Sequence, residues 1–315
     1  ADNAKLDKIE ITITSDANTL QGMYQNDELS VLKVSDELLD QYADENIVDN
    51  KLLRNTFIEF NPNTNEYLAN KNIREALSIA FNRKVFAQQV MHNADLAAYG
   101  LVPYGVKGLD GGDFREQAGP IVKDASDQSE IERAQQLLDQ GLEEIGKTKE
   151  DMQDGFSIQC LESGKVQAQA IQNMWKTNLG IEVELQAEEQ QVQVAERRSG
   201  DFQLTRMRWT ADFTDPFTFL SMYRSNDSYN DNKTNCPEYD ELMAQSNEES
   251  DPTARFELLH QAESVLVNDY CFGVPVLNSS NIYLVSTDIT NFEIDPSRNM
   301  IRTKYLVLGD SSSES

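Results

Sequence analysis

Two carboxylates and two arginines on one short stretch carry the groups best suited to chemistry. Asp212 and Asp215 follow the segment 203–209, which holds Arg206 and Arg208 two positions apart. Alternating residue character over 203–209 predicts a half-buried strand, and the proline after Asp215 predicts the start of a helix. Asp215 therefore has the position of an N-cap, whereas Asp212 has no local structural role. The stretch predicts a strand-to-helix loop on which Asp212 could hold a cationic ligand group.

Asp212 has two other interpretations. A solvent-exposed loop aspartate would explain it without any ligand. A carboxylate pair formed with Asp215 would suit a hydrolase, because general acid and base catalysis uses such pairs. No neighbouring nucleophile or metal ligand supports hydrolysis, and the capping position already accounts for Asp215. We therefore predict that the chain is not an enzyme, while a ligand-binding and a merely solvent-exposed Asp212 both stay open.

Cysteines and histidines are too few and too scattered for a metal site. Cys160, Cys236 and Cys271 form no C-x-x-C pair, so zinc or iron–sulfur ligation has no support. An odd number leaves at least one thiol free, while one disulfide in an oxidising compartment stays open. His92 and His260 lie on helical patterns, which favours surface positions over a metal site or a Ser/His triad. We expect neither a cofactor nor a metal.

Charge and length limit the class of protein. The 27 basic and 54 acidic residues give a formal net charge of −27, which repels phosphate backbones and anionic lipids and argues against a nucleic-acid partner. This excess of acidic residues favours cationic ligands, but it would also be expected if most proteins of the source organism were acidic. A chain of 315 residues with 39% hydrophobic residues predicts two compact units. The sequence contains no run of 18 apolar residues, so it predicts no membrane-spanning helix.

Strand and helix patterns alternate along the chain, which predicts an α/β fold. Strands are expected at 8–14, 52–60, 156–161, 181–185, 203–209, 271–285 and 301–308, and a short strand or turn is expected at 28–34. Helices are expected at 16–24, 35–42, 72–81, 85–91, 130–142, 165–179, 191–198, 216–223, 237–245 and 252–267. The region 107–129 is expected to be a surface connection, and the tail 309–315 to be disordered.

The unit between residues 156 and 210 fixes the expected sheet direction. Strand, helix and strand follow one another twice there, with Gly180 and Gly200 at the positions of helix C-caps. Such units predict a largely parallel sheet with right-handed crossovers. The carboxyl ends of the strands would then face a crevice, and Asp212 comes just after one of them.

Several stretches together resemble the bacterial oligopeptide-binding proteins, which are the extracellular solute-binding proteins of ABC peptide importers. Their order and spacing over roughly residues 5 to 310 make the resemblance specific. The matching stretches are NIREALSIAFNR at 72–83, GLVP at 100–103, WTADFTDP at 209–216, CPEYDELM at 236–243 and the block 254–276.

The resemblance implies a periplasmic-binding-protein-like fold of two lobes, of the class II or cluster C type. Residues 1–58 would form part of lobe I, 59–275 the complete peptide-clamping lobe, and 276–315 the return strand into lobe I with an acidic tail. Family members are considerably longer on the N-terminal side. We therefore expect this chain to be a C-terminal fragment of such a protein.

The resemblance also implies roles for individual residues. Asp212 matches the aspartate that binds the α-ammonium group of the peptide, and Arg206 lies where a basic residue can meet a peptide carboxylate. Trp209 and Phe213 would line the cleft or pack beneath it. Thr210 replaces a cysteine found in some relatives, so we expect their disulfide to be absent.

The implied function is that of the substrate-binding component of an ABC importer. It would bind oligopeptides or dipeptides between its lobes and deliver them to the permease, as an extracytoplasmic monomer that is either periplasmic or a surface lipoprotein. Related proteins use the same scaffold for nickel chelates, haem or sugars, so these ligands stay open. A pheromone or partner-protein receptor with no transport role is a further alternative.

Overall fold

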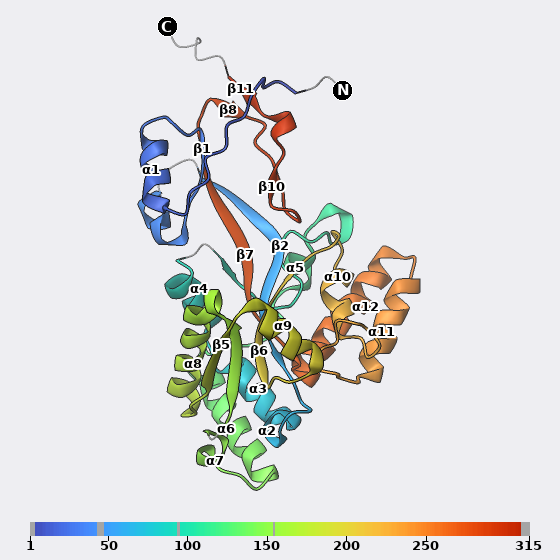
Figure 1. The fold of residues 1–315 in the computed structure, drawn as a ribbon. Coiled ribbons are helices and arrows are strands. Elements are labelled where there is room, and N and C mark those ends of the chain that lie inside the picture. The colour runs from blue at the N-terminus through green and yellow to red at the C-terminus, as the bar shows by residue number, and fades with distance from the viewer. Residues whose placement is uncertain (1–3, 43–46, 93–94, 154, 310–315) are drawn as a thin grey trace.

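Two long strands run through the middle of the molecule in this computed structural model, which describes residues 4–42, 47–92, 95–153 and 155–309 (Figure 1). The strands are β2 (Ile47–Phe60) and β7 (Gly273–Val285), and they pair antiparallel. They connect a large lower body, formed by the described residues between 61 and 272, with a smaller upper part, residues 4–42 and 286–309 (Figure 1). The ligand-site candidates lie near this junction.

The main sheet has seven strands in the order β1-β7-β2-β6-β4-β5, with β3 paired to β7. The strands not yet placed are β1 (Val31–Lys33), β3 (Leu96–Ala97), β4 (Ser157–Leu161), β5 (Glu184–Glu188) and β6 (Leu204–Thr210). Only β4 is parallel to its neighbours, β5 and β6, and the other pairings are antiparallel. The prediction of a largely parallel sheet is therefore wrong outside the strand-helix-strand units, because β2 and β7 enter from opposite ends and need no crossover helix.

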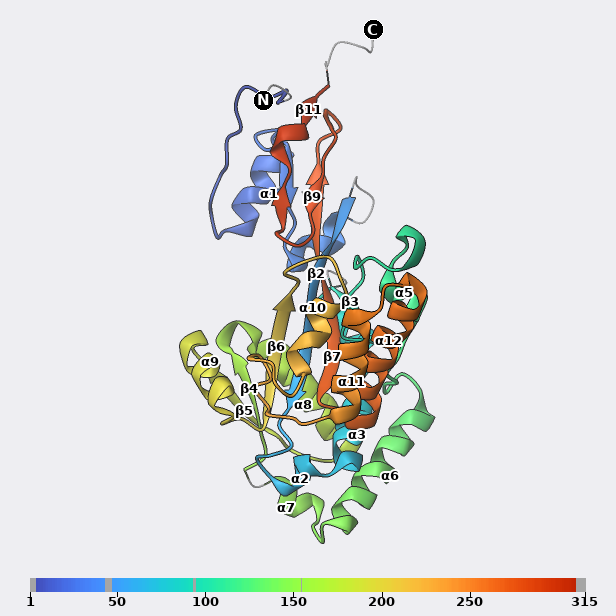
Figure 2. The ribbon, with the colours of Figure 1, turned by 90° about the vertical axis from the view of Figure 1, so that its right-hand side faces the viewer.

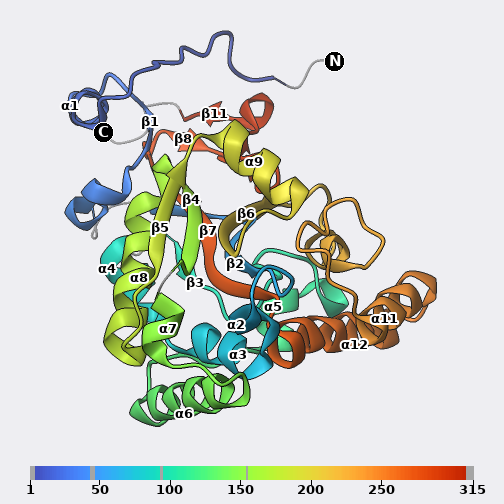
Figure 3. The same ribbon diagram turned by 60° about the horizontal axis from the view of Figure 1, so that its bottom comes forward.

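Helices cover both faces of this sheet (Figures 2 and 3). One face packs into a core that includes Trp175 and Leu77, whose side-chain Nε1 and carbonyl oxygen form a hydrogen bond of 2.9 Å. Helices on this face are α3 (Lys71–Ile79), α4 (Arg83–Val90), α6 (Gln128–Glu144) and α8 (Lys165–Leu179). The other face packs into a second core with α5 (Phe114–Ala118), α10 (Phe217–Leu220), α11 (Pro237–Glu248) and α12 (Pro252–Ser264).

Shorter elements complete the body. They are α2 (Glu66–Ala69), α7 (Lys149–Gln153) and α9 (Gln190–Ser199), and the 3-10 helices Leu109–Gly111, Glu162–Gly164 and Ser221–Tyr223. Helix α12 continues directly into a π-helical turn, Val265–Tyr270, which ends at Cys271 in the left-handed region with φ of 53°.

The upper part holds a third, smaller core. Leu32 and Leu284 are buried there beneath α1 (Ala17–Gln25) and the 3-10 helix Asp36–Tyr42. Two small sheets stand above it, formed by β8 (Ile289–Thr290) with β11 (Val307–Leu308) and by β9 (Ile294–Asp295) with β10 (Met300–Ile301). The 3-10 helix Thr303–Tyr305 joins β10 to β11. The expected single strand at 301–308 is therefore wrong.

Two further expectations are wrong because both depended on contacts with distant parts of the chain. One segment lacks the expected partner, and the other has a partner that was not expected. The segment 8–14 alternates as a strand does, but it pairs with nothing in the described chain, and the side chain of Ile13 is 92% exposed. The region 107–129 is not only a surface connection, because α5 buries Phe114 and Arg115 against α12. Residues 310–315 of the expected disordered tail lie outside the described residues.

Most helix predictions are confirmed to within a few residues. The expected C-caps Gly180 and Gly200 have φ of 72° and 82°, the left-handed conformation that favours glycine. None of the helices in the described ranges is long and apolar enough to cross a membrane.

Candidate ligand-binding site

Strand β6 directs its arginines and its tryptophan to opposite faces of the sheet. Side chains alternate along a strand, so Arg206 and Arg208 share one face, whereas Met207 and Trp209 share the other. Directly opposite positions of an antiparallel pair lie on the same face, and the register places Thr56 opposite Arg208. Arg54, two residues before Thr56, is on that face as well and lies opposite Thr210.

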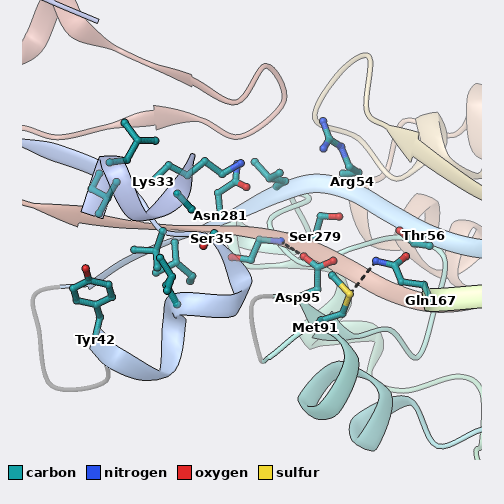
Figure 4. A pocket seen from close by; sticks show the side chains of 18 of the residues that line it. Lys33, Ser35, Tyr42, Arg54, Thr56, Met91, Asp95, Gln167, Ser279 and Asn281 are labelled. Atoms are coloured by element: carbon teal, nitrogen blue, oxygen red, sulfur yellow. Dashed lines mark hydrogen bonds between the residues drawn. The ribbon is translucent and has the colours of Figure 1, made fainter. Parts of the chain in front are cut away.

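A cavity of about 640 Å³ opens on the arginine face, at the junction of the upper part and the lower body. Figure 4 shows Lys33 and Asn281 on one side, Asp95, Met91 and Gln167 on another, and Arg54 with Thr56 at one end. Its walls come from segments far apart in the sequence, and the lining residues are Thr14, Ser15, Ala17, Leu20, Leu32, Lys33, Val34, Ser35, Leu38, Tyr42, Leu52, Arg54, Thr56, Met91, Asp95, Gln167, Arg206, Arg208, Ser279, Ser280, Asn281 and Ile282.

Arg206 is the most deeply buried cation of this cavity, with 5% of its surface exposed. Its guanidinium donates to Oε1 of Gln167 on α8, and its Nε has no hydrogen-bond partner within the described chain. Burial lowers the pKa of Arg206 to about 10, and repulsion from Arg208 adds to this. Gly164 makes room for it, because a Cβ there would lie 2.8 Å from Nη1 of the guanidinium. The site therefore contains a buried, incompletely satisfied positive charge.

Three other cations line the same cavity. Nε of Arg54 donates to Oγ1 of Thr210 at 2.9 Å, and burial followed by repulsion from Arg208 lowers the pKa of Arg54. Arg208 and Lys33 are exposed at its margin. Asp95 is the one carboxylate among the lining residues, and its Oδ1 accepts the N–H of Ser280 at 2.9 Å. The described lining residues thus carry a positive balance of charge, although the protein as a whole has a formal net charge of −27.

Asp212 lies just beyond the end of β6 and is exposed. Its backbone N–H donates to Oγ1 of Thr218 at 3.2 Å, which fixes the start of the loop. Its carboxylate makes no hydrogen bond or ion pair with the part of the chain that the structure describes. A free carboxylate at a strand end can accept a cationic ligand group, as the sequence suggested, although Asp212 is not among the residues that line the cavity.

Asp215 has the structural role that its position predicted. Its Oδ1 accepts the N–H of Phe217 at 2.9 Å at the beginning of α10. Both of its carboxylate oxygens also accept hydrogen bonds from Arg255 of α12, at 2.9 Å each. These contacts give the Asp215 carboxylate a structural role at the start of α10.

Trp209 and Phe213 take different positions. Trp209 is half-buried on the face opposite to Arg206 and packs edge-to-face against Tyr229, with ring centroids 4.9 Å apart. Phe213 lies on the loop with 50% of its surface exposed. Of the four predicted site residues, only Arg206 lines the cavity, and Asp212 and Phe213 lie together on the loop that follows.

Residues from distant segments complete the cavity, and the sequence pattern gave no sign of them. Arg54, Lys33 and Gln167 belong to β2, β1 and α8. The two-residue spacing of Arg206 and Arg208 was the only local signal, because it predicts a common face.

None of the three cysteines is among the residues that line this cavity. Cys160, Cys236 and Cys271 are free and buried, and burial raises the pKa of Cys236 to about 11 and that of Cys271 to about 12. The described residues contain no group of three His, Cys, Asp or Glu side chains that could hold a metal ion.

Comparison with known proteins identifies the family. Residues 1–231 match the bacterial extracellular solute-binding proteins, family 5, middle region. The chain belongs to this family. The fold of this solute-binding protein is similar to that of Listeria monocytogenes OppA bound to peptide, with a TM-score of 0.76 and 22% identity over 98% of this chain and 59% of the other. The predicted family and the periplasmic-binding-protein-like fold are therefore confirmed.

Curated relatives of this solute-binding protein are considerably longer than the chain. It is 33% identical over 291 residues to the dipeptide-binding protein DppE of Bacillus subtilis, covering 91% of the chain and 52% of the relative. It is 35% identical over 205 residues to the oligopeptide-binding protein OppA of Bacillus subtilis, covering 64% of the chain and 36% of the relative. The chain thus spans about half the length, or less, of these relatives.

Proposed function

We propose that this chain belongs to the substrate-binding component of an ABC importer that binds oligopeptides or dipeptides. The observation that carries the proposal is the pair of opposite charges on one segment, a buried Arg206 in the cavity and a free Asp212 beyond the same strand. A peptide has the complementary pair, an α-ammonium group and a terminal carboxylate. Relatives named for binding dipeptides and oligopeptides support the same ligand class.

The spacing of the two charges limits the ligand's length. Asp212 lies six positions after Arg206, and an extended chain rises about 3.3 Å per residue, so their backbones are at most about 20 Å apart. An extended peptide of up to about six residues spans that distance. Charge-assisted hydrogen bonds at both ends would fix the direction of the peptide, and backbone pairing with strand edges would add affinity that is independent of its sequence.

Strands β2 and β7 are the natural hinge of such a receptor, because they join the two parts of the molecule. Closure around the ligand would exclude water from both charged contacts and strengthen them. The lobe boundaries proposed from the sequence, at 58/59 and 275/276, fall within these two strands. We extend the proposal to a monomeric, extracytoplasmic receptor, periplasmic or lipid-anchored, that delivers its ligand to a membrane permease.

The alternative of a hydrolase rested on a carboxylate pair formed by Asp212 and Asp215. Asp215 is held by Arg255 and caps a helix, so it is not available as the second catalytic carboxylate. A binding function needs only the single free carboxylate of Asp212.

Isothermal titration of the full-length protein with a pool of tri- to pentapeptides tests the proposal. We expect the wild type to bind, and Asp212→Asn to lose about tenfold or more in affinity through the lost charge-assisted contact. Asp201→Asn removes an exposed carboxylate outside the loop and serves as the matched control. N-acetylation removes the ammonium charge of the peptide. The affinity of the wild type for N-acetylated peptides should therefore fall to about that of Asp212→Asn for free peptides.

Other outcomes would redirect the assignment. If the wild type bound none of the peptides, the peptide proposal would fail, and nickel chelates, haem and sugars would be the next ligands to test on the same fold. Binding that was equally tight with Asp212→Asn would remove Asp212 from the site and leave the cavity around Arg206.

A further inference from the structure

The cations of the cavity have little counter-charge among the residues that the structure describes. Six arginines elsewhere in the described chain form ion pairs with carboxylates: Arg115, Arg133, Arg197, Arg224, Arg255 and Arg302. Arg54, Arg206 and Arg208 are in none of the ion pairs found in the same ranges. With Lys33, four cations line a cavity to which Asp95 alone, among the described residues, contributes a carboxylate.

This clustering opposes the chain's overall composition. Acidic residues outnumber basic ones two to one, 54 against 27, so a random cavity wall would be acidic. Desolvating several like charges together is unfavourable unless an anion balances them. Burial is the main cause of the lowered pKa values of Arg54 and Arg206, and repulsion from Arg208 adds to both.

The geometry favours an extended ligand with more than one negative group. Arg206 and Arg208 are neighbours on one face of β6, about 7 Å apart along the strand at 3.3 to 3.4 Å per residue. Arg54 lies diagonally across from Arg208 on the paired strand, within reach of the same group. An extended peptide repeats its side chains at the same two-residue spacing, so a carboxylate at Arg206 would bring a nearby side chain to Arg208.

We propose that Arg54 and Arg208 form a second anion subsite beside Arg206, which selects peptides that carry an acidic side chain near their terminal carboxylate. The inference rests on the proposed peptide-binding function and assigns the ligand class within it. Arg206 would receive the terminal carboxylate, while the guanidinium groups of Arg54 and Arg208 would receive the carboxylate of an Asp or Glu side chain.

The test uses matched tetrapeptides that differ in one group. Four tetra-alanine peptides with Glu at each successive position are titrated into the full-length protein, beside four with Gln at the same position. We expect a peptide with Glu at position 3 or 4, near the terminal carboxylate, to bind about tenfold or more tightly than its Gln counterpart. Arg208→Gln and Arg54→Gln should each reduce that ratio to about threefold or less, and thermal unfolding reports whether each variant is folded.

Controls separate a specific subsite from general electrostatics. Arg198→Gln removes the same charge from an exposed position on α9 outside the cavity, and it should keep the wild-type ratio. C-terminally amidated peptides should lose affinity and still prefer Glu, because the terminal carboxylate and the side chain use different arginines. Inorganic phosphate serves as a competitor that has no peptide backbone.

Each contrary result has a distinct meaning. Neutral and acidic peptides that bind equally, or a preference for Glu that survives both arginine variants, would overturn the inference and leave the proposed function standing. Phosphate that bound tightly while Glu gave no advantage would overturn it in favour of a site for a free inorganic anion. If none of the eight peptides bound, the proposed function would fail, and the inference with it.

Discussion

Arg255 of α12 holds both carboxylate oxygens of Asp215, with its Nη1 and Nη2 each 2.9 Å from one of them. Asp215 lies three residues after Asp212, on the loop between β6 and α10. The contact ties this loop to a helix from a later part of the chain. A bidentate pair fixes orientation more strictly than a single contact, so it positions the loop that carries Asp212.

The first prediction concerns this positioning. Arg255→Lys keeps the charge and loses the two-point contact, and we expect peptide affinity to fall severalfold through the less ordered loop. Both side chains are about a third exposed, so the free energy of unfolding should fall by less than about 1 kcal/mol. Titration calorimetry and urea denaturation measure the two effects. Arg302→Lys, in an exposed ion pair of the upper part, is the control; an affinity equal to the wild type's would argue against a positioning role.

A buried ion pair beneath the GLVP segment gives the second prediction. Arg115 donates to Oε2 of Glu263 at 2.6 Å, and Oε1 of Glu263 accepts the N–H of Val102 at 2.8 Å. Both side chains of the ion pair are almost fully buried. Gly100 is needed there, because a Cβ would lie 1.6 Å from Nη1 of Arg115. The pair therefore links α5, this loop and α12.

Glu263→Gln keeps an acceptor for Val102 and leaves the Arg115 charge uncompensated. We expect the free energy of unfolding to fall by about 3 to 5 kcal/mol, because a lone buried charge is costly. Replacing Glu257, which is exposed on the same helix, by Gln should change it by no more than about 0.5 kcal/mol. Denaturant titration of the two variants provides the measurement, and similar midpoints for both would contradict the assigned role.

Glu59 gives a prediction about pH. It is buried on β2, and burial raises its pKa to about 8, with repulsion from Asp231 as the next cause. The folded state therefore holds this proton up to about pH 8, while the unfolded chain releases it near the ordinary pKa of 4.5. Between these values the folded state binds more protons, so the stability that Glu59 contributes falls as pH rises from about 4.5 to about 8.

Measurement of the free energy of unfolding between pH 4.5 and 9 tests this sign. We expect Glu59→Gln to reduce the decline towards alkaline pH, and Glu248→Gln, at an exposed position of α11, to leave it as in the wild type. A decline of the same size in Glu59→Gln would mean that other groups, such as the Arg197–Asp231 pair, carry it.

The sequence alone determined the elements that depend on neighbours a few residues away. The helix expected at 165–179 occupies those residues, and Gly180 ends it in the left-handed conformation. Asp251 caps α12 by accepting the N–H of Ala254 at 2.8 Å. Capping and helical periodicity are local interactions, so they can be recognised without the rest of the structure. The family could also be recognised from the sequence, because the order of the motifs along the chain does not depend on the folded structure.

Tertiary structure decided everything that joins distant segments. An alternating segment forms a strand in a sheet only where another strand lies beside it. Strand β2 pairs with β6 and β7, whereas 8–14 pairs with no strand of the described chain. Arg115 is buried because Glu263, 148 positions later, neutralises it. Arg54, Arg206 and Lys33 meet in one cavity because three strands of the sheet bring them there. Burial and charge pairing at these positions arise from contacts that only the folded chain creates.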